Sequence, residues 1–400
     1  MSGSVGARGP TDGAELTHRR ARTAPAASHA DRAASRERPP SHSKLTHPGP
    51  DLTHPGPRSP PSRPPGPARV PDSVNMRAAY ITQLGSPDLI RIGELPPPAP
   101  GPHDVLVDVE VSAVNHVDTF VRSGAWRTPV EFPFVIGRDL VGTVVAAGAA
   151  ATRFRVGDRV WSNSLGHDGR QGAAAERAVV PVDRLYHLPD GVDPVDAVAL
   201  AHPAATAHLA LFTHGGLRAG ETVAVLGAAG NVGSALVTMA VHAGARVVAV
   251  AAARDAEYVR SLGADTVVDY RADDVPGLIR AAAPDGVDVH VDTSGRNDLE
   301  TAVELLAGRG RIVVLAGLRT RPVLPVGALY LRDRSVRGFA ISHADTAHLA
   351  DAARGIGGLL AAGRLRPRAT EVLPLAEAAE AHRRLDEGKV TGKLVLRVRD

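Results

Sequence analysis

The feature that most constrains the fold is a short apolar stretch followed by three glycines and a longer apolar stretch. Val223–Leu226 is apolar at every position, which predicts a strand buried on both faces. Glycines follow at 227, 230 and 233, and residues 234–242 are predicted to form a helix. Glycine permits a tight turn and a close approach to the backbone, and a helix N-terminus offers free N–H groups. The pattern predicts a dinucleotide site. Its spacing departs from Gly-x-Gly-x-x-Gly, so a tight turn without a ligand is the alternative.

From this first strand and turn onward, strands and helices alternate. Such alternation predicts a parallel, doubly wound sheet of the Rossmann type. The expected strands are 222–226, 246–250, 266–268, 287–291 and 311–315, and the helices between them are 234–242, 255–261, 274–283 and 298–307.

The chain before residue 193 has a different character. Residues 104–113 alternate between apolar and polar side chains, which is typical of a half-buried strand. After residue 335 we expect helices near 344–362 and 375–386 and a last strand, 393–398, that rejoins this all-β unit. Further short strands are expected at 77–82, 89–94, 140–147, 159–161 and 174–180. The predicted domains are therefore 76–200, 201–340 and 341–400, the last completing the first, preceded by an extension at 1–75.

The extension is rich in Pro, Arg, Ser and His and has few large apolar side chains. Such a segment cannot bury enough surface to fold alone, so we expect disorder, or an upstream stretch before a natural start at Met76. It holds 11 of the 46 Lys and Arg and 6 of the 43 Asp and Glu, so residues 76–400 carry a net charge of −2. A basic arm for nucleic acid is the alternative for the extension.

The composition excludes several classes of function. There is no cysteine, which excludes disulfides, Cys-ligated zinc and a thiol nucleophile. We find no apolar run of the ~18 residues that a membrane span needs, and no apolar signal core at the N-terminus. We therefore expect a cytoplasmic protein that does not enter membranes.

From residue 76 onward, the order and spacing of eight blocks resemble the zinc-free, zeta-crystallin-like quinone oxidoreductases of the medium-chain dehydrogenase/reductase superfamily. The resemblance implies a GroES-like β domain plus a Rossmann domain, with the active site between them. The blocks are residues 114–124, 133–144, 155–160, 227–233, 262–265, 291–295, 308–317 and 388–396.

The residues at two positions argue against zinc. Zinc-dependent relatives have cysteine where Asn115 stands and histidine where Arg138 stands, and a guanidinium has no lone pair to donate. His116 and His202 are candidate ligands, but a lone histidine is more often a packing residue. The resemblance implies that Asn115, Asp118, Phe120 and Thr206 line the catalytic slot, with ordinary loop capping as the alternative for Asn115 and Asp118.

The end of the second strand bears on the choice of cofactor. Residues 248–252 hold no carboxylate to bind a ribose 2′-OH, and Arg254 follows, where it could pair with a 2′-phosphate. We therefore expect NADPH, although Asp255 stands where many relatives have lysine. The resemblance adds further cofactor contacts, so the expected set is Gly227, Gly230, Asn231, Val232, Gly233, Arg254, Tyr270, Gly295, Ala316, Gly317, Lys389 and Lys393.

The sequence predicts an NADPH-dependent oxidoreductase that passes hydride to a quinone without a metal. An NADPH-dependent reductase of enones or 2-alkenals is one alternative; a tyrosine that protonates carbon would favour it, and Phe120 is not one. A zinc alcohol dehydrogenase is a more distant alternative. In another class, the chain would be an NADPH-binding crystallin-like or nucleic-acid-binding protein with little turnover. By resemblance we expect a homodimer formed through the edge of the Rossmann sheet, and 321–326 is a candidate for that edge.

Overall fold

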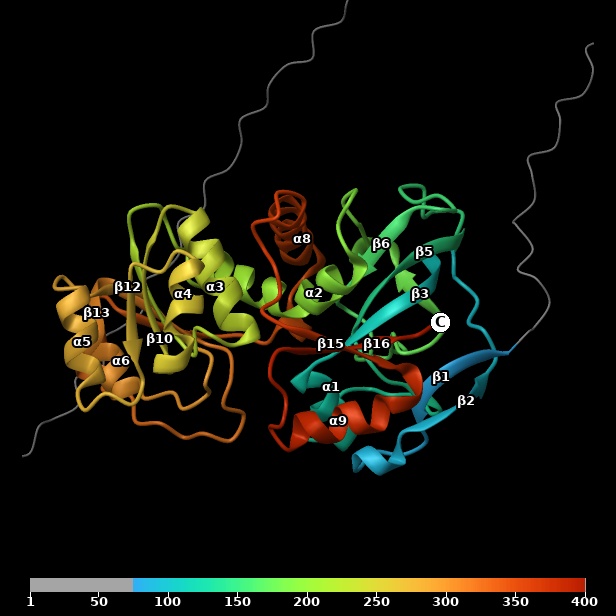
Figure 1. The fold of residues 1–400 in the computed structure, drawn as a ribbon, viewed down its shortest axis with the longest axis horizontal. Coiled ribbons are helices and arrows are strands. Elements are labelled where there is room, and N and C mark those ends of the chain that lie inside the picture. Colours follow the sequence, from blue (N-terminus) through green and yellow to red (C-terminus); the bar gives the residue numbers. More distant parts are fainter. Residues whose placement is uncertain (1–74, 400) are drawn as a thin grey trace, which may run out of the picture. The chain divides into compact units, whose positions relative to one another are not determined.

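Parallel strands form the sheet predicted around the glycine turn. The computed structural model describes residues 75–399; the predicted extension lies outside them, except for residue 75. Within them, the sheet has the strand order β11-β10-β9-β12-β13-β14, and all neighbours are parallel (Figure 1). The order reverses between β9 and β12, and open α/β sheets bind ligands at the carboxyl ends beside such a reversal. The strands are β9 (Thr222–Leu226), β10 (Arg246–Ala251), β11 (Thr266–Asp269), β12 (Val287–Asp292), β13 (Leu306–Val314) and β14 (Ser335–Gly338).

Helices cover both faces of this sheet. We call the sheet and its helices together the α/β lobe. Val225 of β9 belongs to the same buried cluster as side chains of α3 (Asn231–His242) and α4 (Ala256–Ser261). The neighbouring Ala224 belongs to the cluster that α5 (Val275–Ala282) and α6 (Leu299–Leu305) complete. Successive side chains of a strand point to opposite faces, so each helix pair covers its own face. The doubly wound Rossmann arrangement predicted from the sequence is present.

One boundary in this lobe differs from expectation. We expected a helix over 298–307 and a strand over 311–315, but α6 ends at Leu305 and β13 already begins at Leu306. Arg309, between two glycines, takes a left-handed φ of 62°, which a helix does not allow. The strand nevertheless pairs with β12 from its first residue, because Val287 lies opposite Leu306.

A second region, the β lobe, is built mainly from antiparallel strands on both sides of the α/β lobe in the sequence; β15 and β16 pair in parallel. β3 (Asp104–Val114) pairs with β5, β7 and β16, and β16 (Lys393–Arg397) returns from the end of the chain, as expected. This is the GroES-like unit of the prediction; its exact boundaries stay a prediction. The other strands are β1 (Met76–Ile81), β2 (Arg91–Leu95), β4 (Phe134–Val135), β5 (Asp139–Ala147), β6 (Arg159–Ser162), β7 (Arg177–Pro181), β8 (Tyr186–His187) and β15 (Thr370–Pro374).

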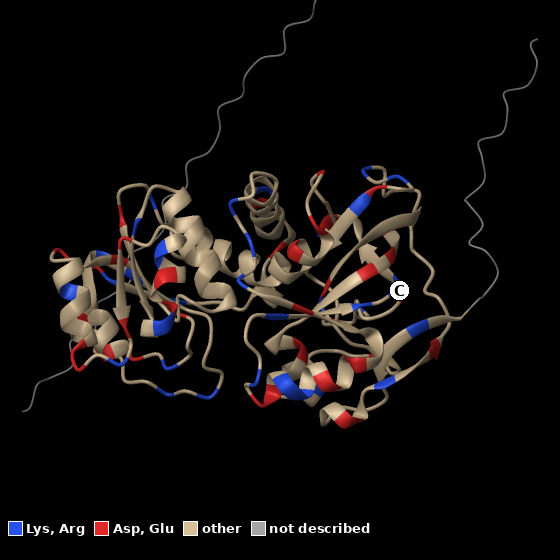
Figure 2. Cartoon of the chain, in the orientation of Figure 1, with Lys and Arg blue, Asp and Glu red and all other residues tan. Residues whose placement is uncertain are grey.

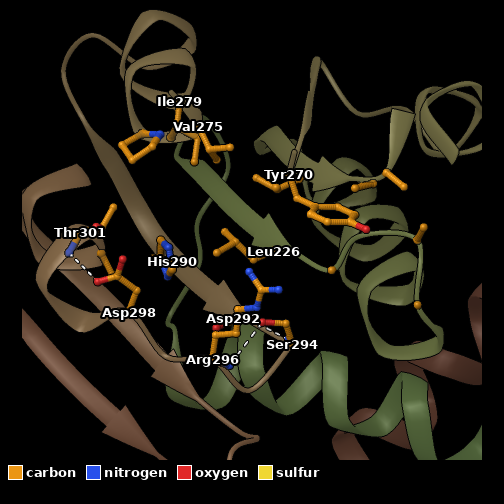
Figure 3. A pocket seen from close by; sticks show the side chains of 18 of the residues that line it. Leu226, Tyr270, Val275, Ile279, His290, Asp292, Ser294, Arg296, Asp298 and Thr301 are labelled. Carbon is orange, nitrogen blue, oxygen red and sulfur yellow. Dashed lines mark hydrogen bonds between the residues drawn. The ribbon is translucent and has the colours of Figure 1, made fainter. Parts of the chain in front are cut away.

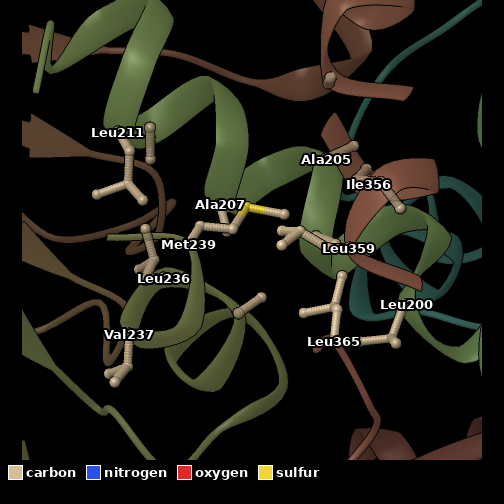
Figure 4. Close-up of a cluster of buried hydrophobic side chains, with 14 of the residues drawn as sticks. Leu200, Ala205, Ala207, Leu211, Leu236, Val237, Met239, Ile356, Leu359 and Leu365 are labelled. Atoms are coloured by element: carbon tan, nitrogen blue, oxygen red, sulfur yellow. The ribbon is translucent and has the colours of Figure 1, made fainter. Parts of the chain in front are cut away.

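The longest buried helix was not predicted. α2 (Pro194–His208) continues as a π-helix over Leu209–His214 and contacts α3, α8, β3 and β5. Figure 4 shows Leu200, Ala205 and Ala207 of α2 in one cluster with Met239 of α3 and Ile356 of α8. Because α2 is buried on nearly all sides, its sequence lacks the one-sided apolar stripe that reveals a helix. The other helices are α1 (His116–Ser123), α7 (Val326–Tyr330), α8 (Thr346–Ala361) and α9 (Ala378–Asp386).

The same helical stretch corrects the expectation that no apolar run in the sequence is long enough to span a membrane. Among the described residues, Pro194–His214 is long and apolar enough to cross a membrane by length and composition alone. However, 78% of its apolar window is buried inside the protein. That burial is what a core helix of a globular lobe requires.

Candidate functional site

Three glycines shape the turn between β9 and α3, and two of them are sterically required. Gly227 has φ of 76°, and a Cβ there would lie 2.4 Å from Oγ1 of Thr293. A Cβ on Gly233 would lie 2.1 Å from the carbonyl oxygen of Gly227. Gly230 is the N-cap of α3, and no side chain caps this helix. The first N–H groups of α3 are therefore left for an anionic ligand, as a dinucleotide pyrophosphate requires.

A cavity of about 510 Å³ opens beside this turn, at the carboxyl ends of β9, β10 and β12 (Figure 3). Four of the predicted cofactor residues line it: Gly227, Gly230, Arg254 and Tyr270. Val232 and Gly233 lie in the first turn of α3 beyond its rim. The cavity and the uncapped helix together fit the adenosine and phosphate half of a dinucleotide.

Two arginines, Arg254 and Arg368, lie near the end of β10. The carboxylate in this region, Asp255, is paired with both of them. The Arg254 side chain is 82% exposed, with its Nε 3.9 Å from Asp255. Asp255 itself accepts a hydrogen bond of 2.7 Å from Arg368, whose guanidinium also lies 4.7 Å from the ring of Tyr258. Arg368 therefore balances the negative charge of Asp255, which stands where many relatives have lysine. The Tyr270 hydroxyl accepts a hydrogen bond of 3.0 Å from Nε of Arg271.

The loops after β12 and β13 meet at a pair of predicted glycines. A Cβ on Gly295 would lie 2.9 Å from the backbone nitrogen of Gly317. Asn297 joins the two loops, because its Nδ2 donates to the carbonyl of Ala316 at 2.9 Å. Gly295, Ala316 and Gly317 thus lie together, but none of them lines the 510 Å³ cavity.

In the β lobe, Asn115 lies at the centre of a buried polar network. Its backbone N–H donates to Asp118 at 2.8 Å, and its Nδ2 donates to Asp139 at 2.9 Å. Its Oδ1 accepts a hydrogen bond from Nζ of Lys393. Arg138 completes the network, with its Nε 4.0 Å from Asp118 and one Nη donating to Oγ of Ser342 at 2.7 Å. All five charged or amide side chains are at most 5% exposed.

Burial dominates the protonation of these groups. It raises the pKa of Asp118, against the nearby positive charge of Arg138. It raises the pKa of Asp139 to about 7, although Lys393 favours the charged carboxylate. The same burial lowers the pKa of Lys393, which the two carboxylates oppose.

A smaller cavity of about 190 Å³ adjoins this network. Asn115, His116, His202 and Lys393 line it together with Asn231 of α3, whose Nδ2 donates to the carbonyl of Gly392 at 2.9 Å. The structure therefore brings two predicted cofactor residues, Asn231 and Lys393, to the predicted catalytic residue Asn115. Burial lowers the pKa of His202 well below its usual value, so this histidine is neutral.

Three other predicted residues lie apart from both cavities. Phe120 on α1 is 37% exposed and lines neither cavity. The Thr206 hydroxyl donates to the carbonyl of His202 at 2.9 Å, one turn back in α2. Lys389 is on the surface, where its Nζ lies 2.8 Å from Glu387, and this carboxylate raises its pKa.

The donor set around Asn115 does not fit a zinc ion. Its amide oxygen already accepts from a cationic ammonium group, and its amide nitrogen is a donor. Arg138 has no lone pair for a metal. Within residues 75–399, no group of three or more His, Cys, Asp or Glu side chains is arranged to hold a metal ion.

Sequence reasoning missed three buried residues of these sites. Asp139 follows Arg138 directly, and a second charge in an otherwise apolar strand was a signal that it is paired. His290 stands in β12, whose residues alternate between apolar and polar, so the pattern gave no sign that this histidine is buried and lines the larger cavity. Asn297, with φ of 53°, had no signal beyond its presence in a glycine loop.

Comparisons with known proteins agree with this architecture. The alcohol dehydrogenase GroES-like domain matches residues 101–190, and the zinc-binding dehydrogenase domain matches residues 262–396. The quinone oxidoreductase of Pseudomonas aeruginosa is 33% identical over 330 residues, which cover 80% of this chain and 97% of that protein.

Solved structures extend the likeness. A mycobacterial protein in complex with NADPH has a TM-score of 0.70 and 31% identity, covering 80% of this chain and 99% of its own. A structure described as an NAD-dependent alcohol dehydrogenase has a TM-score of 0.72 and 32% identity, with the same coverage. This chain is therefore an oxidoreductase that belongs to the medium-chain dehydrogenase/reductase superfamily, among its quinone oxidoreductases.

Proposed function

We propose that the protein is an NADPH-dependent oxidoreductase that transfers hydride to a quinone without zinc. The observation that carries this proposal is the network of Asn115, in which both ends of the amide are already hydrogen-bonded to other side chains of the protein. A matching family model is named for zinc binding, but the two residues in question, Asn115 and Arg138, do not offer metal ligands. Reduction of a quinone needs no metal, because no alcohol has to lose a proton.

The surroundings of the larger cavity support NADPH over NADH. No carboxylate ends β10, Arg254 is exposed at the rim, and Arg368 pairs with Asp255. A 2′-phosphate would meet positive charge here and little repulsion. One similar structure was solved with NADPH, whereas another is described as an NAD-dependent alcohol dehydrogenase.

One group of residues would hold the cofactor, and another would shape the place of the reaction. NADPH, when bound, supplies the hydride. The turn at Gly227 and Gly230 and the first N–H groups of α3 would hold its phosphates, and Arg254 the 2′-phosphate. Asn115, fixed by Asp118, Asp139 and Lys393, would present a rigid polar wall to the nicotinamide side. Such rigidity is the protein's contribution when the cofactor supplies the chemistry.

We propose a homodimer formed through β14. This strand has β13 as its neighbour on one side and ends the sheet, so its other edge is left for a partner strand. Exposed apolar side chains lie just before it: Leu318, Val323, Val326, Tyr330 and Leu331, each at least 59% exposed. A second copy would cover this surface. Over the described residues, acidic and basic side chains are interspersed on the same elements (Figure 2), so this part of the chain offers nothing that favours nucleic acid.

The test is an NADPH-oxidation assay with purified protein on matched panels of quinones and enones, in parallel with NADH. We expect faster turnover of quinones than of enones, a preference for NADPH, and no loss of rate after treatment with a chelator. Faster enone reduction would favour the alkenal reductase alternative, and faster turnover of NADH would contradict the 2′-phosphate argument. Stoichiometric zinc in the purified protein would contradict the metal-free site.

A further inference from the structure

The floor of the 510 Å³ cavity carries a histidine to which the proposed function gives no role. His290 lies within β12, two residues before Asp292, so both side chains point to the same face of the sheet. Figure 3 shows its imidazole between Asp298 and Leu226. The side chain is 4% exposed, and its Nδ1 is buried without a hydrogen-bond partner.

Nδ1 has almost no accessible surface, so a ligand in the cavity would reach the ring through its other nitrogen, Nε2. Burial lowers the pKa of His290 to about 4, more than the carboxylates of Asp292 and Asp298 raise it. The ring is therefore neutral near pH 7, and offers one donor and one acceptor.

The other buried polar group of the cavity is already satisfied. Asp292 is 4% exposed, and its two oxygens accept the backbone N–H groups of Ser294 and Asn297 at 2.7 and 2.8 Å. Asp292 thus holds the loop, and His290 is the buried group that lines the cavity without such bonds.

The walls indicate the chemistry of that ligand. Val275 and Ile279 of α5 and Leu305 of α6 line the cavity around His290. Aliphatic walls suit the faces of a flat ring, and a neutral imidazole suits a ring edge that carries both donors and acceptors. An adenine edge has this character, with an amino group beside ring nitrogens.

We propose that His290 hydrogen-bonds the edge of the adenine ring, so that the protein recognises the base from the floor of its cavity. The inference rests on the proposed function only in requiring that an adenine dinucleotide occupies this cavity. It makes no use of the 2′-phosphate, the nicotinamide or the acceptor. His290 is then a specificity residue for the base, far from the reacting atoms.

The test is calorimetric binding of adenosine 5′-monophosphate and of ribose 5-phosphate, which has the same sugar phosphate without a base. The variants are His290→Val, which removes the polar group, and His290→Gln, which keeps an amide near the position of Nε2. We expect His290→Val to weaken binding of adenosine monophosphate about tenfold, His290→Gln to retain most of it, and ribose 5-phosphate to bind all forms equally.

His382 provides a matched control. It is also buried, at 1% exposed, with an unpaired Nδ1, but it lies on α9 and lines neither the 510 Å³ nor the 190 Å³ cavity. His382→Leu should leave binding of both probes unchanged, and thermal unfolding of each variant checks that it is folded.

Two results would overturn the inference while leaving the proposed function intact. One is unchanged binding of adenosine monophosphate in His290→Val. The other is an equal loss for both probes, which would mean that the cavity is distorted and not that a base contact is missing. If the unmodified protein bound no adenosine monophosphate, the dinucleotide site itself would be wrong, and both proposals would fall.

Discussion

The 190 Å³ and 510 Å³ cavities differ in the partners that the protein gives to their polar groups. Around Asn115, charged side chains and an amide bond to one another, although Oδ1 of Asp139 and Nδ1 of His202 have no partner there. Around His290, aliphatic side chains and Asp298 line the cavity, and Nδ1 of the imidazole has no partner. Several partners thus fix the Asn115 amide, whereas His290 takes part in no such network. The difference separates residues that hold the site in place from a residue proposed to contact a ligand.

The largest effect should come from opening the closed network. Lys393→Met removes the ammonium group from Asn115 and leaves Asp118 and Asp139 buried with less positive charge. We expect the free energy of unfolding to fall by about 3–5 kcal/mol, as for other broken buried ion pairs, measured by urea unfolding. The control is Lys389→Met, an exposed lysine paired with Glu387, which should not change stability measurably. Equal changes in the two variants would mean that the network is not a stabilising unit.

Ligand binding in the 510 Å³ cavity depends on the glycine turn. In Gly233→Ala the new Cβ would lie 2.1 Å from the backbone oxygen of Gly227, so the turn must move. We expect binding of adenosine monophosphate to weaken at least about tenfold in calorimetry, because small misplacements at a binding turn have large effects. Gly358→Ala on α8 places its methyl group in open space and should bind as the parent protein does. Unchanged binding in Gly233→Ala would show that the turn does not contact the ligand.

The protonation of Asp139 gives a second test of the network around Asn115. The pKa of Asp139 is raised to about 7, above its usual 3.8, so the folded state holds a proton that the unfolded state has lost. The stability that this carboxyl contributes is complete below about pH 4 and is lost as the pH rises to about 7. Subtracting the unfolding free energy of Asp139→Asn from that of the parent protein should give a difference that falls across this range. A flat difference would contradict the raised pKa.

The smallest effect concerns the rim of the open cavity. Arg254 is 82% exposed, so water screens its interaction with a bound phosphate. In Arg254→Gln we expect the preference for NADPH over NADH, as a ratio of kcat/KM values, to fall about fivefold, since a screened charge pair contributes only modestly. The rate with NADH should stay the same. An unchanged ratio would assign the 2′-phosphate to other arginines, such as Arg271 or Arg368.

The elements with a clear period were predictable from the sequence. Val223–Leu226 and the three glycines predicted β9, the turn and α3, and the alternation that followed predicted the parallel sheet. α2 was missed because a helix buried on nearly all sides has no polar face, so its sequence shows no period. β13 begins earlier than expected because pairing with β12 outweighs the weak strand preference of Gly308–Gly310.

The site residues likewise divide into those that could be predicted from the sequence and those that could not. Glycine positions could be predicted, because their role is local to the backbone. The network around Asn115 could be predicted only in part, since Asp139 and Lys393 are brought to it by strands that are distant in the sequence. His290 gave no signal, because it occupies a polar position in the alternating strand β12, and its burial depends on the cavity that α5 and α6 help to form. The acceptor slot stays a prediction, because Phe120 and Thr206 line neither cavity.

The pairing of β16 with β3 has a consequence for the order in which the protein can mature. A ribosome releases β3 and Asn115 early, then the entire nucleotide-binding sheet, and only near the end the strand that carries Lys393. Until that strand arrives, Asp118 and Asp139 lack their lysine, whereas the glycine turn is already complete. A nascent or shortened chain could thus hold a dinucleotide long before it has a finished place for the reaction.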